Sequence, residues 1–482
     1  MKRLVAAFPV PENFSAALLS LSRDHNPVQI LNSHRPQQLA SDRYASYDFL
    51  AALDMREEIR GGADCFPRLQ DFLDRTGDWI FGGFSYDLKN QLEKLHSDHT
   101  DRLRFPDYHF FQPRYVLAVP AGSDTLYVYY LPDTDTTASV EFLIGQIREA
   151  SRQNPEANTE SRRETAPLQH SASPVFGGKE STSVLAAKAV ATIPVPTSGM
   201  QLSGTVTREE YVETVNRIKQ HIARGDIYEM NYCMEFYAED VTIDPVTTCL
   251  RLNAVSPMPF SCFYRADDHY LLCASPERFL KKSGTKIISQ PIKGTARRGK
   301  TAAEDLLVKE QLLASPKERS ENVMIVDLVR NDLSRTALPG SVDVEELFGI
   351  YSFQTLHQMI STVVSEVSGD MPVTEIIRSA FPMGSMTGAP KIKAMQLIEE
   401  FEQSRRGWYS GATGYFSPPE EGVSTGYAFD LNVVIRSIGY HAATKTLSFM
   451  AGSAITMQSD AESEYEECLL KAQSMKRALT HD

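Results

Sequence analysis

The chain has 482 residues, of which 42% are hydrophobic and 23% are charged. This composition is typical of a soluble globular protein built as one large domain or two to three ordinary ones. The net charge of −13 argues against non-specific binding of nucleic acid, which needs a basic surface. An anionic substrate would need local help from lysine, arginine, a helix N-terminus or a metal.

Neither a membrane nor export is indicated by the sequence. No window is long and apolar enough to span a bilayer. The apolar run at the N-terminus is too short for a secretory signal, and a proline soon follows it. The six cysteines show no CxxC pair and no zinc spacing. We therefore expect a cytoplasmic protein with free, mostly buried thiols and no nucleic-acid or membrane partner.

Residues 1–150 read as a mixed scaffold without a catalytic constellation. Asp78–Asp87 predicts a buried strand with a Gly-Gly point of close approach, and Tyr115–Pro120 with Thr125–Tyr130 predicts a hairpin. Asp135–Arg152 has helical periodicity. Residues 151–204 lack a sustained period, so we expect a linker or mobile insertion ahead of a denser part at 205–482.

The C-terminal part opens with helix and strand signals. Thr207 and Glu210 have capping-box spacing at the start of an amphipathic helix. Ile227–Phe236 then alternates as a strand, with Glu229 and Glu235 on its polar face. That face is either solvated or the wall of a site.

Pro291–Gly299 contains the lysine around which the prediction is built. Lys293 precedes a glycine and is followed by two arginines, and a nucleophilic lysine needs burial or nearby positive charge to lower its pKa. From these residues alone, a strand end with a solvated lysine is favoured. Glu277 lies just beyond a predicted strand, a place suited to proton transfer, although an exposed salt bridge with Arg278 is the alternative. A hairpin around Ser283–Thr285 would bring Glu277 and Lys293 together.

Two acidic pairs have the spacing of one helix face. Glu318 and Glu321 follow a serine N-cap and a proline, and Glu464 and Glu467 lie near the start of the final helix. Facing each other, the pairs would form an oxygen site for Mg²⁺. The residues alone favour the alternative, which is two acidic first turns that complement helix dipoles.

Other polar positions allow two interpretations each. Thr387–Lys391 opens a helix whose free N–H groups bind an anion or are simply capped. His357 is by default a structural histidine. Arg436 ends an apolar strand as a carboxylate clamp or as an edge-strand arginine. Ala451–Ile455 predicts a small-residue turn where a ligand could contact backbone.

Six ordered motifs carry a resemblance to a known family. They are Ser275–Phe279, Pro291–Thr295, Glu321–Asp332, Phe381–Lys391, Tyr409–Gly411 and Asp460–Glu467. From about residue 203 to its end the chain resembles the chorismate-utilising enzymes, which include anthranilate synthase component I, aminodeoxychorismate synthase component I, and the isochorismate and salicylate synthases. Trp79–Leu95 resembles the N-terminal domain of the two amine-transferring members. The resemblance implies an α+β fold of two packed antiparallel sheets flanked by helices.

The resemblance also implies a set of site residues. Mg²⁺ would be bound by Glu321 and Glu467, with Glu318 and Glu464 close by, and would hold the ring carboxylate of chorismate. Glu277 matches the general acid that protonates the departing ring hydroxyl. Residues that match substrate-binding positions are Lys471 at the ring carboxylate, Tyr409 and Arg436 at the enolpyruvyl carboxylate, and Gly294, Thr295, His357, Thr387 and Gly452 along the pocket.

The residues at two positions distinguish among the family members. Relatives that add water carry a lysine at the position of Glu229, and anthranilate synthases carry an alanine at the position of Lys293. The Pro291–Thr295 form resembles aminodeoxychorismate synthase, in which the lysine attacks C2, expels the 4-hydroxyl and is displaced by ammonia at C4. The amine-transferring relatives usually have glutamine at position 229. Our hypothesis is that Glu229 accepts a proton from Lys293 or from ammonia.

The source of ammonia lies outside this sequence. No cysteine is placed in a glutaminase nucleophile elbow, so we predict a separate glutamine amidotransferase subunit. The predicted function is the synthase subunit that makes 4-amino-4-deoxychorismate for 4-aminobenzoate and folate synthesis. The alternatives are anthranilate synthase component I and a non-catalytic, chorismate-binding regulatory subunit.

Overall fold

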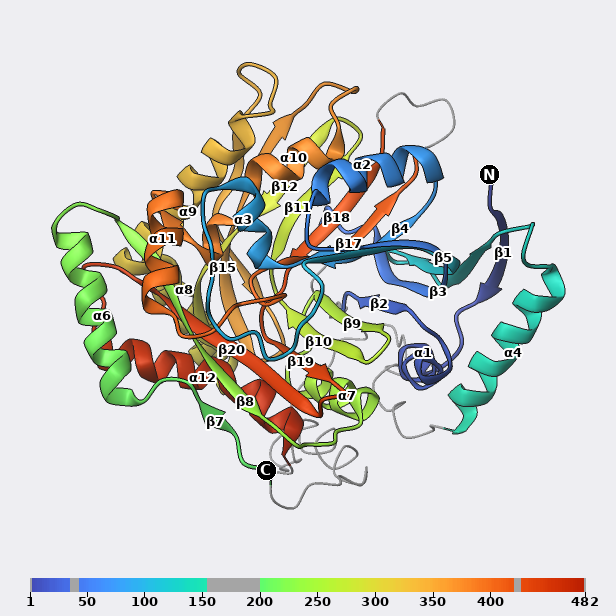
Figure 1. Cartoon of the computed structure of the whole chain (residues 1–482), viewed down its shortest axis with the longest axis horizontal. Helices are drawn as coiled ribbons and strands as arrows, with labels where there is room; N and C mark the ends of the chain where they lie inside the picture. The colour runs from blue at the N-terminus through green and yellow to red at the C-terminus, as the bar shows by residue number, and fades with distance from the viewer. Residues whose placement is uncertain (1, 35–42, 154–199, 420–425, 481–482) are drawn as a thin grey trace, which may run out of the picture.

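The computed structural model describes residues 2–34, 43–153, 200–419 and 426–480. Most of the predicted linker, at 154–199, lies outside these ranges. The paired strands run antiparallel and form one continuous network (Figure 1). Two branches meet at β3 (Tyr47–Gly61) and β5 (Tyr108–Pro120), which are long enough to pair in both.

The first branch runs outward from these two long strands to both sides. Its further strands are β1 (Leu4–Pro9), β6 (Thr125–Tyr130), β2 (Val28–Asn32), β9 (Phe260–Ala266), β10 (His269–Ser275), β19 (Ser437–His441), β20 (Thr446–Ile455), β8 (Glu229–Ala238), β7 (Ser203–Gly204) and β16 (Gly388–Ala389). The second branch consists of β4 (Ile80–Phe84), β17 (Ala412–Ser417), β18 (Ala428–Val433), β11 (Arg278–Ser283), β12 (Lys286–Gln290), β15 (Leu356–Glu366), β13 (Ile292–Arg297) and β14 (Asp343–Ser352).

Helices cover each branch and create a separate core there. The core of the first branch takes side chains from α1 (Phe14–Leu21), α4 (Thr137–Gln153), α6 (Arg208–Ala223), α7 (Pro245–Val255), α11 (Lys391–Phe401) and α12 (Ala461–Leu479). The core of the second takes them from α2 (Cys65–Thr76), α9 (Pro316–Ser334) and α10 (Val373–Ala380). The remaining helices are α3 (Lys89–Leu92), α8 (Ala302–Ala314), η1 (Ser22–Asp24), η2 (Tyr86–Leu88) and η4 (Gly384–Met386).

The two branches also contact each other. Gln29 on β2 donates to Thr413 Oγ1 on β17 at 3.1 Å, and both side chains are buried. A smaller apolar cluster contains side chains from both branches. N-terminal strands are interleaved with C-terminal ones, because β2 pairs with β9 and β4 pairs with β17. The α+β class with a large antiparallel sheet is confirmed, and the strand pairings link the two branches into one network.

Several local predictions are confirmed, and one is wrong. Thr207 and Glu210 form a capping box, and Ser315 caps α9 ahead of its proline. The hairpin around residues 121–124 is present. Ala451–Ile455 is not a turn but the end of β20, where small residues permit close pairing with β8. A Cβ on Gly452 would lie 2.4 Å from Cys233 Sγ.

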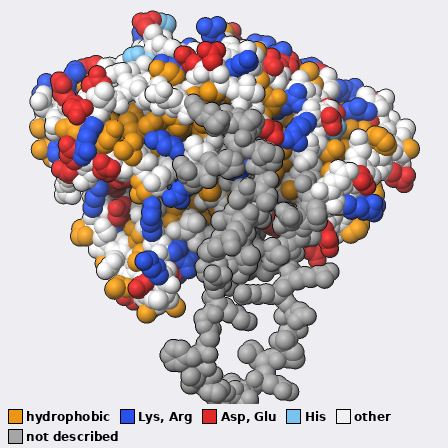
Figure 2. All heavy atoms as spheres, turned by 90° about the horizontal axis from the view of Figure 1, so that it is seen from below, with side chains coloured by type: hydrophobic (Ala, Val, Ile, Leu, Met, Phe, Trp, Pro, Cys, Tyr) orange, Lys and Arg blue, Asp and Glu red, His pale blue; other side chains and the backbone are white. Residues whose placement is uncertain are grey.

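In the part of the chain that the structure describes, every helix is too short or too polar to cross a bilayer. On the face drawn in Figure 2, Lys and Arg side chains are interspersed with Asp and Glu. The described side chains on this face therefore mix both signs of charge.

The Gly-Gly approach in β4 gives the first prediction. Gly82 has φ +152°, and a Cβ there would lie 1.9 Å from the His109 carbonyl oxygen. We expect Gly82→Ala to destabilise the fold by about 1–3 kcal/mol, because β4 must move off β5. Gly145→Ala is the control, since its Cβ meets nothing within 4 Å on α4, and it should stabilise by about 0.5–1 kcal/mol. Thermal unfolding measures both, and equal midpoints would contradict the close approach.

Candidate active site

Lys293 lies at an irregular point of β13. The register with β15 shifts between Ile292 and Thr295, and Gly294 has φ +95°. Such a bulge redirects the neighbouring side chain. A Cβ on Gly294 would lie 2.9 Å from Glu318 Oε2, so backbone and carboxylate are close. The sequence therefore needs a glycine here to place Lys293 beside α9.

The Lys293 ammonium is paired with Glu229. Nζ lies 2.5 Å from Oε1, and the two side chains are 10% and 8% exposed. Burial lowers the pKa of Lys293, but Glu229 and then Glu321 oppose this, and its pKa is raised above the ordinary lysine value. Lys293 is thus a buried ammonium and not the solvated lysine that the residues alone favoured.

Glu277 is a buried acid between β10 and β11. It is 5% exposed, and its backbone N–H donates to Ser275 Oγ at 3.2 Å. Burial raises its pKa to about 7, although Lys293 opposes the rise. Near neutral pH a substantial fraction is therefore protonated, as a general acid must be. Arg278 pairs with Asp430 at 2.9 Å, so an exposed Glu277–Arg278 salt bridge is excluded.

The two acidic pairs face each other across α9 and α12. Lys317 Nζ lies 3.4 Å from Glu464 Oε1 and 4.0 Å from Glu321 Oε1, so one cation bridges the helices. Burial raises the pKa of Glu321 to about 7, and burial followed by the charge of Glu467 raises that of Glu318. The four carboxyl groups therefore gather around Lys317, where burial lowers its pKa but their charges together raise it above the ordinary lysine value.

These carboxylates fit a hard divalent cation. Mg²⁺ prefers carboxylate oxygens, and Glu321 Oε1 is a buried oxygen that lacks a hydrogen-bond partner. Among residues 2–34, 43–153, 200–419 and 426–480, no three His, Cys, Asp or Glu side chains form a group that could hold a metal as they stand. Lys317, which is 45% exposed, lies between the helices within 3.4 Å of Glu464 Oε1.

Lys471, Gly452 and Glu467 are brought together. Lys471 Nζ donates to the Gly452 carbonyl oxygen at 2.8 Å and pairs with Glu467 Oε1 at 2.8 Å. Burial raises the pKa of Glu467, but Lys471 outweighs it, and the pKa is lowered. Glu467 is therefore held ionised, which suits a metal ligand.

Arg436 is a half-buried guanidinium with φ 49° after β18. Its Nη1 lies 3.7 Å from Met258 Sδ, and no carboxylate forms an ion pair with it within the described ranges. Burial lowers its pKa to about 10. A buried cation of this kind is stabilised by an anion, so the position suits a substrate carboxylate. Tyr409, the other residue predicted there, has its hydroxyl 3.8 Å from Cys233 Sγ.

Three predicted pocket residues differ in their surroundings. His357 is fully buried, and its ring nitrogens contact Asp305 Oδ1 and Ser352 Oγ, both at 2.9 Å. Thr387 donates its hydroxyl to the carbonyls of its own turn, and its carbonyl accepts from Asn231 N–H at 2.8 Å. Thr295 is exposed on β13. His357 and Thr387 therefore support the walls of the site through contacts with other parts of the protein.

Glu402 and Arg406 were missed in the sequence. Their side chains are 2% and 1% exposed and lie 2.6 Å apart. Glu402 accepts from Cys233 N–H at 2.9 Å, while Arg406 donates to the carbonyls of Met386 and Asn231 at 2.6 and 3.0 Å. The pair thus joins β8, the turn before α11 and the loop that carries Tyr409. The i,i+4 spacing of Glu402 and Arg406 did not predict a pair, because this spacing brings side chains together within a helix and α11 ends at Phe401.

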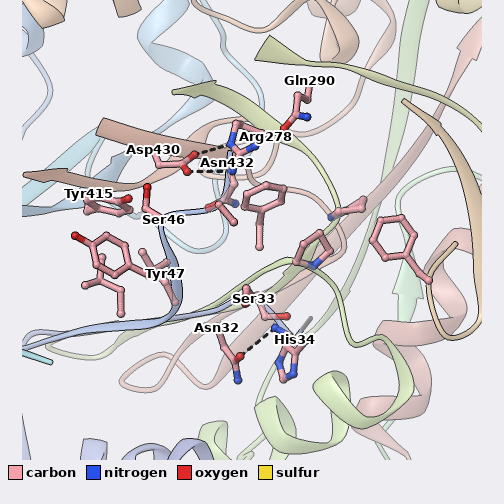
Figure 3. A pocket seen from close by; sticks show the side chains of 18 of the residues that line it. Asn32, Ser33, His34, Ser46, Tyr47, Arg278, Gln290, Tyr415, Asp430 and Asn432 are labelled. Atoms are coloured by element: carbon pink, nitrogen blue, oxygen red, sulfur yellow. Dashed lines mark hydrogen bonds and ion pairs between the residues drawn. The ribbon is translucent and has the colours of Figure 1, made fainter. Parts of the chain in front are cut away.

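A separate cavity of about 120 Å³ lies between the branches (Figure 3). Its lining includes Ser46, Tyr47, Tyr415, Asn432 and Arg278, and the ion pair from Arg278 to Asp430 forms part of its wall. Every residue predicted for catalysis, metal or substrate lies elsewhere. The cavity is therefore distinct from the Lys293 site.

Comparison with known proteins defines the family. The profile of the chorismate binding enzymes matches residues 26–477. The chain therefore belongs to the chorismate-binding enzyme family. It is similar to aminodeoxychorismate synthase component 1 of Bacillus subtilis (36% identity, 59% of this chain, 58% of the relative) and of Escherichia coli (36%, 57% and 58%). The chain thus spans under two thirds of the length of the curated relatives it matches.

Solved structures show the same fold. Anthranilate synthase component I from Streptococcus pneumoniae is 23% identical with a TM-score of 0.70, covering 92% of this chain and 95% of that one. The menaquinone-specific isochorismate synthase from Escherichia coli is 16% identical with a TM-score of 0.68, covering 99% and 95%. The arrangement of branches and helices is therefore that of anthranilate synthase component I-like structures.

The Glu402–Arg406 pair gives a stability prediction. Arg406→Met leaves a buried carboxylate without its partner, which costs about 3–5 kcal/mol. Arg378→Met is the control, since that arginine pairs with Glu375 at the surface, where both side chains are at least 40% exposed, and a change within about 0.5 kcal/mol is expected. Urea unfolding compares the two variants. Equal losses of unfolding free energy would show that the buried pair stabilises the fold no more than the surface pair does.

Glu277 gives a pH prediction. Its pKa of about 7 in the folded chain lies above the ordinary value of 4.5, so the folded state holds the proton more tightly. Stability from this group is present at low pH and is lost as pH rises from about 4.5 through about 7. Glu277→Gln should therefore show a smaller fall in unfolding temperature between these limits. An unchanged fall would contradict the buried, protonated carboxyl.

Proposed function

We propose that the chain is the synthase subunit of an aminodeoxychorismate synthase, which converts chorismate and ammonia into 4-amino-4-deoxychorismate. The single observation that carries this is a buried lysine, Lys293, beside a buried acid, Glu277, within a chorismate-binding family member. The names of the Bacillus subtilis and Escherichia coli relatives support the same reaction.

In the proposed mechanism, Lys293 and Glu277 have complementary roles. The Lys293 amine attacks C2 of the ring, and Glu277 gives its proton to the departing 4-hydroxyl, which leaves as water. Ammonia then attacks C4, and the C2–N bond breaks with its electron pair returning to Lys293. The carboxylate of Glu277 takes a proton from the new ammonium. Atoms and charges balance over these steps, which begin and end with Lys293 as a neutral amine and Glu277 as a carboxylic acid.

The remaining site residues would hold and orient the substrate. Arg436 and Tyr409 are proposed at the enolpyruvyl carboxylate, and Lys471 at the ring carboxylate. Gly294, Thr295, His357, Thr387 and Gly452 are proposed along the pocket. Glu321 and Glu467, with Glu318 and Glu464 close by, would hold Mg²⁺, which supplies positive charge for the ring carboxylate when bound.

Partner, compartment and domain division complete the proposal. A glutamine amidotransferase subunit would deliver ammonia, which the "component 1" in the names of relatives supports. The product would serve 4-aminobenzoate and folate synthesis in the cytoplasm, and the six free cysteines support a reducing compartment. We further propose that residues 1–150 and 205–482 form an N-terminal and a catalytic part joined by 151–204, and that the branches correspond to two packed sheets.

Anthranilate synthase component I is the second candidate, because the S. pneumoniae structure of that name shares the fold. The two reactions differ in their products. Aminodeoxychorismate synthase retains the pyruvyl ether and places the amine at C4, whereas anthranilate synthase releases pyruvate. A non-catalytic regulatory subunit would turn over neither, and the buried Lys293–Glu277 arrangement disfavours it.

Lys293→Ala tests the function directly. With chorismate, Mg²⁺ and ammonium, the wild type should form aminodeoxychorismate without pyruvate, and the variant should lose this activity by at least about 100-fold because the nucleophile is gone. Chromatography with mass detection identifies the product, and a pyruvate assay detects anthranilate chemistry. Lys309→Ala, on the partly exposed α8, is the control and should retain activity. Full activity in Lys293→Ala would remove the covalent route.

A further inference from the structure

The Lys293–Glu229 contact is set by the fold. Glu229 begins β8, where Ala389 of β16 pairs with it, while Lys293 lies on β13 in the other branch. The 2.5 Å contact therefore joins two strands whose positions are fixed by separate ladders. Surface ion pairs, in contrast, join long side chains that are free to separate.

The charged groups that act on Lys293 come from each element around it. They are Glu229 on β8, Glu321 on α9 and Glu277 ahead of β11. Glu277 is engaged as the acid for the leaving hydroxyl, and both it and Glu321 have pKa values raised to about 7 by burial. Glu229 is the carboxylate in ion-pair contact with Lys293 in the described part of the chain. An ammonium held in this way has no lone pair and does not attack carbon.

We propose that Glu229 is a further catalytic residue, which accepts the Nζ proton of Lys293 and thereby creates the nucleophile. This role rests on the proposed aminodeoxychorismate chemistry. The Nζ–H bond breaks, its electron pair stays on nitrogen, and the proton forms an O–H bond on Glu229. The lone pair then forms the bond to C2. When ammonia later displaces Lys293, the amine leaves neutral and recovers its proton from Glu229.

Burial of the pair favours this transfer once substrate is bound. Removing water disfavours both charged forms, so a buried carboxylic acid and amine gain relative to a buried ion pair. Substrate over the site would cover the 10% and 8% of the side chains that remain exposed. The distance of 2.5 Å lets the proton pass directly, without an intervening water.

Proton counting gives this role a signature. The reactive pair, amine plus acid, holds the same number of protons as the resting ion pair. Attack through Glu229 therefore needs no net loss of a proton, and its pH dependence around neutrality is that of Glu277, which must still hold the proton for the leaving hydroxyl. Without Glu229 the Lys293 proton must go to solvent, so the rate relative to the wild type rises about tenfold per pH unit until Lys293 itself has titrated.

The experiment measures attack without ammonia, so that the ionisation of ammonium does not enter. Enzyme, Mg²⁺ and chorismate are mixed and quenched, and intact-protein and peptide mass spectrometry follow the adduct of chorismate minus water on Lys293 at several pH values. The wild type should form adduct at a rate that is flat below about pH 7 and falls above it, as Glu277 loses its proton. Glu229→Gln should form adduct at least about tenfold more slowly at pH 7, and its rate relative to the wild type should rise by about tenfold per pH unit.

Two controls separate this role from damage to the strand. Glu229→Asp keeps a carboxylate and should restore the wild-type profile. Glu235→Gln makes the same chemical change on the same face of β8, where Glu235 accepts from Arg102, Ser404 and Ser448, and its profile should match that of the wild type. Parallel profiles in the wild type and Glu229→Gln would overturn the role of Glu229 and leave the covalent route intact. No adduct in the wild type would overturn the covalent route, and Glu229 with it.

Discussion

The site depends on one buried ion pair between strands of the two branches. Lys293 and Glu229 are separated by 64 residues, and they meet because β8 and β13 are each fixed by their own ladders. Breaking a buried pair by removing one partner is costly, on the order of 3–5 kcal/mol. The fold therefore holds Lys293, the proposed nucleophile, in its unreactive, protonated form.

The surrounding electrostatics follow from this pair and from burial. Glu277 and Glu321 both keep protons near neutral pH because desolvation disfavours their charged forms. Burial instead lowers the pKa of Arg436, which is a half-buried cation without a carboxylate partner among the described residues. Glu277 and Glu321 can thus donate protons and Arg436 can receive an anion, features that suit the proposed dicarboxylate substrate with a hydroxyl leaving group.

Local signals predicted much of this, and long-range packing explains what they missed. The helix caps at Thr207 and Ser315 could be predicted from the sequence, because a cap joins residues three positions apart in the chain. From the residues alone, Lys293 is expected to be solvated and the acidic pairs to complement helix dipoles. The burial of Lys293 and the facing of α9 and α12 depend on segments that are distant in the sequence. The family motifs instead implied a reactive lysine and a metal site at these positions; the structure shows that Lys293 is buried and that the acidic pairs lie around Lys317. Ala451–Ile455 was read as a turn because its small residues suit turns, whereas they serve close strand pairing beside Cys233.

The protonation state of Lys293 at rest is the central claim of this account. Nitrogen NMR of the Lys293 side chain in protein labelled at lysine Nζ, assigned with Lys293→Ala, measures it through a pH titration. The account predicts an ammonium signal throughout the neutral range, with a pKa above the ordinary lysine value of about 10.4. A neutral amine near pH 7 would contradict the ion pair on which the rest of the site depends.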